Sequence, residues 1–323
     1  MKKAVSLTLA LALAFILLVG CGQQSAEPED KQITVAYSQL QTTTVWRQEQ
    51  LRSIQEAVEA NGHRFIFADA QSSIAKQAAD IEDLITQGAD YLVVSPDDWR
   101  GLESSLDYAK AEGVPVIVID REIDIPPGEL YLCYIGADFW AEGRNVAEWL
   151  VEETGGNAKV IEILGGPSSA ATGRSEGFYG VVDNYPGIEI LASQTGSWTK
   201  LDAQNVMENL IQAHGSDIEV VYSHADEMTL GILVALGNAG MNPGTDVLVC
   251  GVDGTYIVVQ RLLSGEMNAN YLCDNKFGPA VADVIEKHRR GEEIPGQVVL
   301  EGFLFTQENV AANIQKSANY GID

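Results

Sequence analysis

The chain has 323 residues, of which 46% are hydrophobic, and it carries a formal net charge of −26. This length suits two domains with cores of their own, and the excess of acids argues against nucleic acid or an anionic membrane surface as a partner. The acids are scattered along the chain, so they indicate solubility rather than an acidic tail.

The first 20 residues predict an export signal that is not part of the fold. A positively charged start, MKK, is followed by an apolar run and then by small residues before Cys21. The piece LVGC (18–21) resembles a bacterial lipobox, which predicts that Cys21 is the first mature residue, carries lipid and anchors the chain to the outer face of the cell membrane. Residues 21–32 are then a polar tether. The alternative is an ordinary secretory signal with a chance cysteine.

From residue 33 onward, short β-rich runs alternate with helical stretches. Strands are expected at 33–37, 64–69, 91–95, 115–120, 131–136, 159–164, 188–193, 219–223, 246–250, 267–273 and 297–303. Such alternation predicts βαβ units in parallel sheets. Polar residues follow the strands in both halves, which favours two open, doubly wound α/β sheets facing each other across a cleft over a single barrel.

Three cysteines remain within the predicted fold, at positions 133, 250 and 273. Their odd number and their spacing do not fit a disulfide framework or a zinc site, and each lies in or beside an apolar run. We therefore expect buried free thiols, no bound metal and no cofactor.

The strand ends carry the residues that point to a ligand. Asp120 and Arg121 close the apolar strand 115–120, and Trp198 follows a later strand. A carboxylate accepts from a hydroxyl, a guanidinium donates to one, and the apolar face of a sugar packs on an indole. These residues predict a site for a neutral polyol. The alternative for Asp120 and Arg121 is a simple pair that caps the next segment.

Other chemistries are weaker in this sequence. The stretch GPSSAATGRS (166–175) resembles a phosphate loop, but it is too long and has Arg in place of Lys. His224 is the one histidine at a strand end, and no nucleophile accompanies it. A secreted glycosidase remains open, because Asp120 and Asp253 could face each other across the cleft.

A set of short motifs carries a resemblance to a known family. They are, in chain order, SQLQTTTVWR, ADAQ, IDREID, GADF, GRSEGF, GSWT, YSHADEM and GVDG, between residues 38 and 254. With the export signal, they make the chain resemble the type I periplasmic sugar-binding lipoproteins of ABC importers, in the ribose and galactofuranose branch and closest to the galactofuranose-binding type. The resemblance covers residues 33–320.

The resemblance implies a fold, a partner and a set of contacts. It implies an N-terminal lobe of 33–136 plus 274–302 and a C-terminal lobe of 137–273 plus 303–323, joined by three crossings. It implies a monomer that binds a monosaccharide as its hinge closes and delivers it to ABC permease subunits, and so a binding protein rather than an enzyme. A sensor that reports a sugar or nucleoside to a membrane receptor is the alternative. The ligand contacts implied by matching motifs, with weaker candidates last, are Trp46, Arg47, Asp120, Arg121, Arg174, Trp198, Asp253, Ser38, Asp138 and Asp226.

Two positions depart from the family pattern. Ala225 and Phe139 stand where the family usually has Asn. Each change removes an amide from the expected pocket, and one buried polar contact changes discrimination by roughly 1–3 kcal/mol. We therefore expect a furanose, pentose or related polyol that has fewer hydroxyls or presents an apolar face to these two residues.

Overall fold

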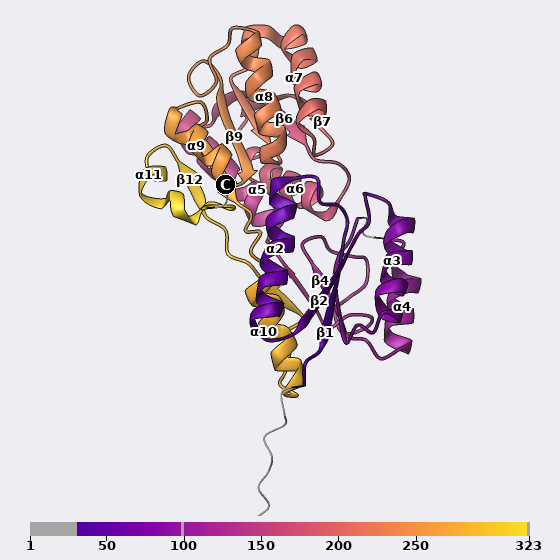
Figure 1. Ribbon diagram of the computed structural model, residues 1–323. Coiled ribbons are helices and arrows are strands. Elements are labelled where there is room, and N and C mark those ends of the chain that lie inside the picture. Colours follow the sequence, from indigo (N-terminus) through magenta and orange to yellow (C-terminus); the bar gives the residue numbers. More distant parts are fainter. Residues whose placement is uncertain (1–30, 98–99, 322–323) are drawn as a thin grey trace, which may run out of the picture. The chain divides into compact units, whose positions relative to one another are not determined.

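Two six-stranded sheets organise the computed structural model of this protein, in which residues 31–97 and 100–321 are described (Figure 1). The strand orders are β11-β5-β4-β3-β1-β2 and β12-β10-β9-β8-β6-β7. Every strand pair is parallel except β10 with β12, which is antiparallel. The predicted class of two open α/β sheets is confirmed.

The first sheet lies mostly in the first part of the chain. Its strands are β1 (Thr34–Gln39), β2 (Arg64–Asp69), β3 (Tyr91–Ser95), β4 (Val116–Ile119), β5 (Cys133–Gly136) and β11 (Gln297–Val299). Every residue of β3, β4 and β5 is buried. Continuous apolar strands are what a parallel sheet covered on both faces requires, because the side chains on neither face meet water.

The second sheet has the same order of connections. Its strands are β6 (Asn157–Leu164), β7 (Gly187–Thr195), β8 (Val220–Ser223), β9 (Leu248–Asp253), β10 (Ala269–Leu272) and β12 (Leu304–Thr306). The strand expected at 297–303 ends early: β11 covers only its first three residues and joins the first sheet. Residues 300–303 pass between the sheets, and β12, which was not expected, follows them and joins the second sheet.

Helices flank the two sheets. They are α2 (Val45–Ala60), α3 (Ile74–Thr86), α4 (Glu103–Ala111), α5 (Phe139–Thr154), α6 (Ser169–Val182), α7 (Lys200–His214), α8 (Asp226–Asn238), α9 (Tyr256–Ser264), α10 (Gly278–Arg289) and α11 (Val310–Asn313), with short 3₁₀ turns at Gly215–Asp217 and Ile314–Lys316. Figure 1 shows α2 beside α10, and α5 packs against α6.

Side-chain caps fix where several of these helices begin. Thr44, Ser73, Ser168 and Thr199 each accept a hydrogen bond from a backbone N–H in the first turn of the following helix. Removing such a cap costs about 1 kcal/mol. The caps therefore hold helix N-termini at the strand ends, where the candidate site lies.

The chain passes between the sheets at three segments. They are residues 137–138 between β5 and α5, residues 273–277 between β10 and α10, and residues 300–303 between β11 and β12. Sheet membership does not assign each connecting residue to a lobe, so the lobe boundaries given above stay a prediction.

Some expectations concern parts of the chain that the structure does not describe. The export signal (1–20), Cys21 and nearly all of the tether (21–32) lie outside the described residues. Among the residues that are described, no helix has the length and apolar character needed to cross a membrane. Cys133, Cys250 and Cys273 are free and buried, as predicted.

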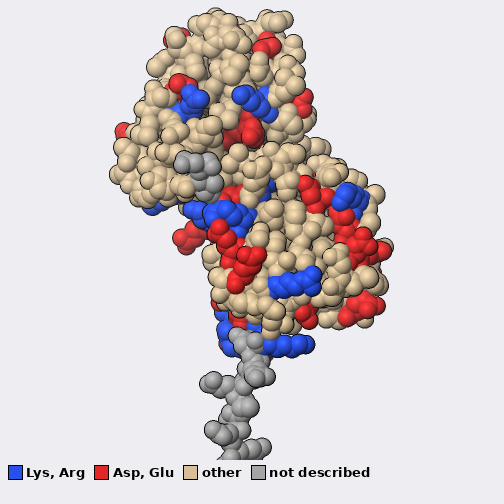
Figure 2. All heavy atoms as spheres, viewed as in Figure 1, with Lys and Arg blue, Asp and Glu red and all other residues tan. Residues whose placement is uncertain are grey.

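Charged side chains are interspersed on the face shown in Figure 2. Acids and bases lie near one another on this face. Several of the chain's charged side chains form short pairs, such as Lys76 with Asp80 at 2.7 Å and Lys287 with Asp283 at 2.7 Å. Exposed pairs of this kind contribute little to stability. The surface is therefore consistent with the solubility role that the scattered acids indicate.

Candidate ligand-binding site

A cavity of about 140 Å³ lies where strand ends and helix N-termini of both sheets come together. An apolar protein cavity of about 150 Å³ holds benzene, so this one has room for a single five- or six-membered ring. Its walls are supplied by Gln41, Thr44, Val45, Trp46, Arg47, Asp120, Arg121, Phe139, Ala170, Arg174, Trp198, Ala225, Asp226, Glu227, Leu230, Asp253, Thr255, Ile257 and Cys273.

Most of the residues expected at the site line this cavity. The structure brings together, from segments more than 200 residues apart, Trp46, Arg47, Asp120, Arg121, Phe139, Arg174, Trp198, Ala225, Asp226 and Asp253. That they touch a ligand stays a prediction.

Two expected residues, Ser38 and Asp138, do not line the cavity. Ser38 is fully buried inside β1, which continues to Gln39, so the residues beyond the end of the strand begin later in the chain. The Asp138 carboxylate accepts a hydrogen bond from the Ala141 N–H at 2.8 Å and caps α5. Asp138 is thus used by the fold, and Ser38 lies one residue before the end of its strand, neither of which a strand-end rule foresees.

On the first-sheet side, Asp120 is held by Arg47. The Arg47 Nη1 lies 2.6 Å from Asp120 Oδ2, and both residues are over 90% buried. Arg47 Nη1 also donates to Gln50 Oε1 at 3.0 Å and to Ser95 Oγ at 3.2 Å. A buried ion pair with such support keeps its geometry, so the Asp120 carboxylate is held in a fixed position at the cavity wall.

Arg121 does not pair with its neighbour Asp120. Its Nη1 donates to the Asp97 carbonyl at 2.7 Å, and its guanidinium carbon lies 5.8 Å from the centre of the Trp198 ring. Burial, followed by the nearby charge of Arg47, lowers the pKa of Arg121 to about 10. The alternative of a mutual Asp120–Arg121 cap is therefore wrong, and Arg121 remains a charged donor at neutral pH.

On the second-sheet side, Arg174 connects α6 to the end of β9. Its Nε donates to Glu142 Oε2 at 2.7 Å, and its Nη2 lies 3.4 Å from Asp253 Oδ1. Burial would lower the pKa of Arg174, but the two carboxylates outweigh burial and raise it. The guanidinium also donates to the His224 carbonyl, so three elements fix its plane.

Burial raises the pKa of two carboxyls that line the cavity, Asp226 and Asp253. For Asp253 the pKa is raised to about 6, although Arg174 acts in the opposite direction. Its Oδ2 accepts from the Asp226 N–H at 3.0 Å. Asp226 itself serves the fold: it accepts from the Thr255 N–H, the Thr255 hydroxyl and Asn270 Nδ2, each at 2.6 Å. Of the two acids, Asp253 is therefore the one with capacity left for a ligand.

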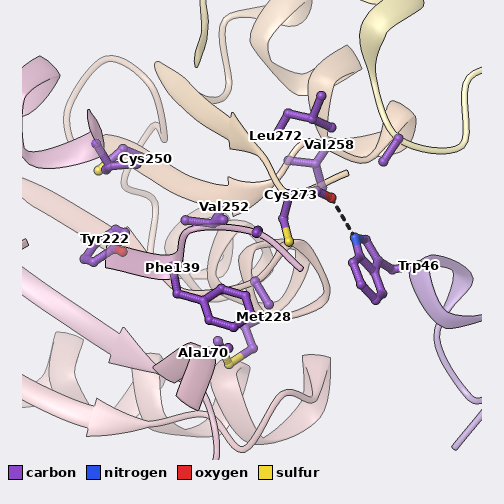
Figure 3. Close-up of a cluster of buried hydrophobic side chains, with 14 of the residues drawn as sticks. Trp46, Phe139, Ala170, Tyr222, Met228, Cys250, Val252, Val258, Leu272 and Cys273 are labelled. Carbon is purple, nitrogen blue, oxygen red and sulfur yellow. Dashed lines mark hydrogen bonds between the residues drawn. The ribbon is translucent and has the colours of Figure 1, made fainter. Parts of the chain in front are cut away.

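Two indoles border the cavity. Figure 3 shows the Trp46 indole nitrogen directed at the Cys273 carbonyl, to which it donates at 3.0 Å. Trp198 lies against Gly165 and Gly166, and a Cβ atom built on Gly165 would come within 2.1 Å of its ring. The glycines thus provide a flat support that orients the Trp198 ring.

Backbone strain marks three residues of the site. Asp120 has φ 65°, Trp198 has φ 63° and Asp253 has φ 115°, all in the range that non-glycine residues rarely adopt. Residues in such conformations cost about 1–3 kcal/mol each and cluster at functional sites. All three were expected at the site from their positions past strand ends.

His224 belongs to a buried network beside the site. Its Nε2 lies 3.1 Å from Glu162 Oε1, and Glu162 also accepts from Ser175, Tyr179 and Ser193. Burial lowers the pKa of His224. Because neither His224 nor Glu162 lines the cavity, the network holds the end of β8 and the carbonyl that Arg174 contacts.

Several cavity residues were not expected. Gln41, Thr44, Thr255 and Glu227 were not singled out as ligand contacts, and Cys273 was expected only as a buried thiol. Thr44 caps α2 and Glu227 lies in the first turn of α8. A rule that includes the N-cap and the first turn of the following helix would have found both.

Comparison with known proteins gives this site a context. A family model described as "Periplasmic binding protein domain" matches residues 35–293. The chain is 32% identical to the galactofuranose-binding protein of Escherichia coli (strain K12) over 295 residues, which is 90% of this chain and 92% of that protein.

Solved structures agree with this match. The periplasmic binding protein component of the arabinose ABC transporter from Shewanella sp. ANA-3, bound to α- and β-L-arabinofuranose, has a TM-score of 0.84 and 33% identity, covering 88% of this chain and 95% of that chain. A protein from Mycobacterium smegmatis in complex with β-D-fucofuranose has a TM-score of 0.83 and 33% identity, covering 87% and 93%.

Proposed function

Because the chain belongs to the periplasmic binding protein family, we propose that it captures a sugar in the cavity between the two sheets and delivers it to an ABC importer. The observation that carries this proposal is the site itself: ion-paired carboxylates and guanidiniums surround a cavity for one ring, with indoles at its border. Rigid acceptors and donors of this kind match hydroxyl groups, which both donate and accept.

The ligand class follows from the chemistry of the lining. Asp120, Arg121 and Asp253 supply acceptors and donors, whereas Phe139, Ala225 and Leu230 supply apolar surface on the second-sheet side. A hydroxyl placed against this apolar surface would lose its hydrogen bonds to water and gain none. We propose a furanose or related polyol with an apolar group there, as a 6-deoxy sugar such as fucofuranose would provide.

Binding is coupled to a change between two arrangements of the lobes. The three segments 137–138, 273–277 and 300–303 are the proposed hinge, with the lobes bounded as given above. Ligand favours the closed arrangement because only then do Arg47, Asp120 and Arg121 contact it together with Arg174 and Asp253. The importer is proposed to recognise the closed form.

We further propose that the chain acts as a monomer tethered to the outer face of the membrane through lipid on Cys21. Mass spectrometry of the purified protein would test the anchor. A mature N-terminus at residue 21 with the mass of attached lipid is expected, and cleavage elsewhere without lipid would contradict it.

A glycosidase is the remaining enzyme alternative. The raised pKa of Asp253 would suit a general acid, but the adjacent Arg174 favours its ionised form, and Asp120 is paired with Arg47. We therefore propose no catalytic role, and sustained release of sugar from a panel of nitrophenyl glycosides would refute this.

The proposal is tested by a thermal-shift screen of the exported chain carrying Cys21→Ser. Pentoses, hexoses, methyl furanosides, deoxy sugars, polyols and nucleosides are compared. A ligand at a hundred times its dissociation constant adds about 2.7 kcal/mol of stability, which is a clear shift. A response confined to furanosides or deoxy sugars is expected; a response to nucleosides alone would overturn the sugar assignment. A membrane receptor gene beside this one, without permease genes, would favour the sensor alternative.

The variant Ala225→Asn tests directly whether Ala225 makes the cavity prefer a deoxy sugar over a sugar with one more hydroxyl. Ala225 is 6% exposed at the cavity wall, so an amide added there should improve binding of a sugar with one more hydroxyl relative to its deoxy counterpart by about 1–3 kcal/mol. Unchanged relative affinities, measured by calorimetry, would show that Ala225 does not set ligand preference.

A further inference from the structure

A second cavity, of about 610 Å³, adjoins the first. Both cavities are lined by Gln41, Thr44, Arg121, Trp198 and Glu227, which we call the collar. Several of the other residues of this outer chamber are exposed, including Thr43, Ser72, Pro167, Ser197 and Lys200. The inner cavity has room for one ring. A substituent on that ring can extend past the collar into the larger and more exposed outer chamber.

The lining of the outer chamber is half polar and half apolar, and its charges are balanced. Thr43, Ser72, Ser197 and Thr199 contribute hydroxyls, and the cations Arg121 and Lys200 are matched by Asp97 and Glu227. Within the described part of the chain, no partner is found for the hydroxyls of Ser72 and Ser197. Such a surface suits a neutral group that donates and accepts hydrogen bonds and also has apolar faces, as a sugar ring does.

Two strained turns border this chamber from opposite sheets. After β2, the Ser73 N–H donates to the Ala70 carbonyl, and Gln71 and Ser72 both have positive φ. After β7, the Thr199 N–H donates to the Gly196 carbonyl, and Ser197 and Trp198 both have positive φ. Turns of this geometry are dominated by Gly, Asn and Asp. These two turns keep this geometry although they carry larger side chains. The turns place Ser72, Ser197 and Trp198 at the outer chamber.

We propose that the outer chamber is a subsite for a second sugar unit, so that the preferred ligand is a furanosyl disaccharide rather than a free monosaccharide. This inference rests on the proposed function. One ring occupies the inner cavity between Asp120 and Asp253, the glycosidic linkage passes the collar, and the second ring meets the hydroxyl-rich lining.

Calorimetry on the exported chain carrying Cys21→Ser tests the inference. For arabinose and galactose, the free sugar, its methyl furanoside and a disaccharide with the same furanosyl unit are titrated. The methyl furanoside locks the ring form without filling the chamber, so it separates the effect of the second ring from that of ring form. The disaccharide of the preferred sugar is expected to bind at least tenfold more tightly than the methyl furanoside.

A pair of variants localises the effect. Thr43→Trp fills the outer chamber without touching the inner cavity, and Gln55→Trp adds the same side chain at an exposed position of α2 outside both. Thr43→Trp should abolish the disaccharide advantage and leave the methyl furanoside affinity within twofold. Gln55→Trp should change neither.

The outcomes separate the two proposals. Equal affinity for the methyl furanoside and the disaccharide, or an unaltered advantage in Thr43→Trp, would overturn the second-sugar subsite and leave the sugar-binding proposal standing. Tighter binding of a nitrophenyl furanoside than of the disaccharide would also overturn it, in favour of an apolar substituent. If neither the arabinose compounds nor the galactose compounds bind, the sugar-binding proposal and the second-sugar subsite both fail for these sugars.

Discussion

Replacement of Asp120 by Asn isolates one charge of the site. Asp120 has φ 65°, and Asn tolerates this region better than other non-glycine residues, so the substitution adds no backbone strain. It leaves the buried Arg47 guanidinium with Gln50 and Ser95 but without its carboxylate at 2.6 Å. The variant thus changes charge while keeping shape.

The magnitude follows from burial. Removing one partner of a buried ion pair costs about 3–5 kcal/mol, and because Asn and the two neutral partners retain part of the network we expect the lower end, about 3 kcal/mol. For a chain of this size that corresponds to a melting temperature lower by about 5 °C. Loss of a charge-assisted hydrogen bond to a ligand hydroxyl weakens binding by roughly 10- to 150-fold.

Differential scanning calorimetry and titration calorimetry measure the two effects. Asp124→Asn is the matched control, because Asp124 lies in the same segment, is 58% exposed and faces Arg100 at 3.4 Å; such a surface pair is worth about 0–1 kcal/mol. The double variant Arg47→Met with Asp120→Asn should lose less stability than the sum of the single changes. Wild-type stability and affinity in Asp120→Asn would refute the view that this pair organises the site.

Two further predictions concern the second-sheet side. Because burial raises the pKa of Asp253 to about 6, its ionised form should fade on acidification, and ligand affinity should be about tenfold lower at pH 5 than at pH 8; a flat calorimetric profile would show that the carboxylate does not accept from the ligand. Because the pKa of Asp253 is higher in the folded chain than in the unfolded chain, protonation of this carboxyl stabilises the fold. That contribution is complete below pH 4 and is lost as the pH rises through 6. Gly165→Ala places a Cβ within 2.1 Å of the Trp198 ring and should weaken binding about tenfold by turning the indole, with altered tryptophan fluorescence; Gly237→Ala, where no atom lies within 4 Å, is the control.

The sequence was sufficient for the layout of the fold because periodicity and strand chemistry are local. It located eleven strands and predicted two open sheets, and it failed at 297–306, where the decisive fact is which sheet each half joins. The local sequence pattern does not reveal which sheet a strand joins. The length of β1 was also underestimated, which moved the expected site residue to Ser38 when the cavity begins at Gln41.

At the site, residue types were predictable and their partners were not. Strand-end reasoning identified Asp120, Arg121 and Asp253, because ligands bind beyond the carboxyl ends of parallel strands. It did not reveal that Asp120 pairs with Arg47 or that Arg121 reaches Asp97. Those pairings depend on the depth and rotamer of each side chain, which are set by contacts between residues distant in the chain.

The order in which the strands occur along the chain has a consequence for how the protein is made. The first sheet is not complete until β11, and the second gains its last edge with β12, so both are finished only by the final 30 residues of the chain. A nascent chain that has emerged only as far as β10 has two unfinished sheets, with β5 and β10 presenting unpaired edges that favour aggregation. Completion of both sheets is therefore deferred until β11 and β12 have been made, so the edges of β5 and β10 stay open longest.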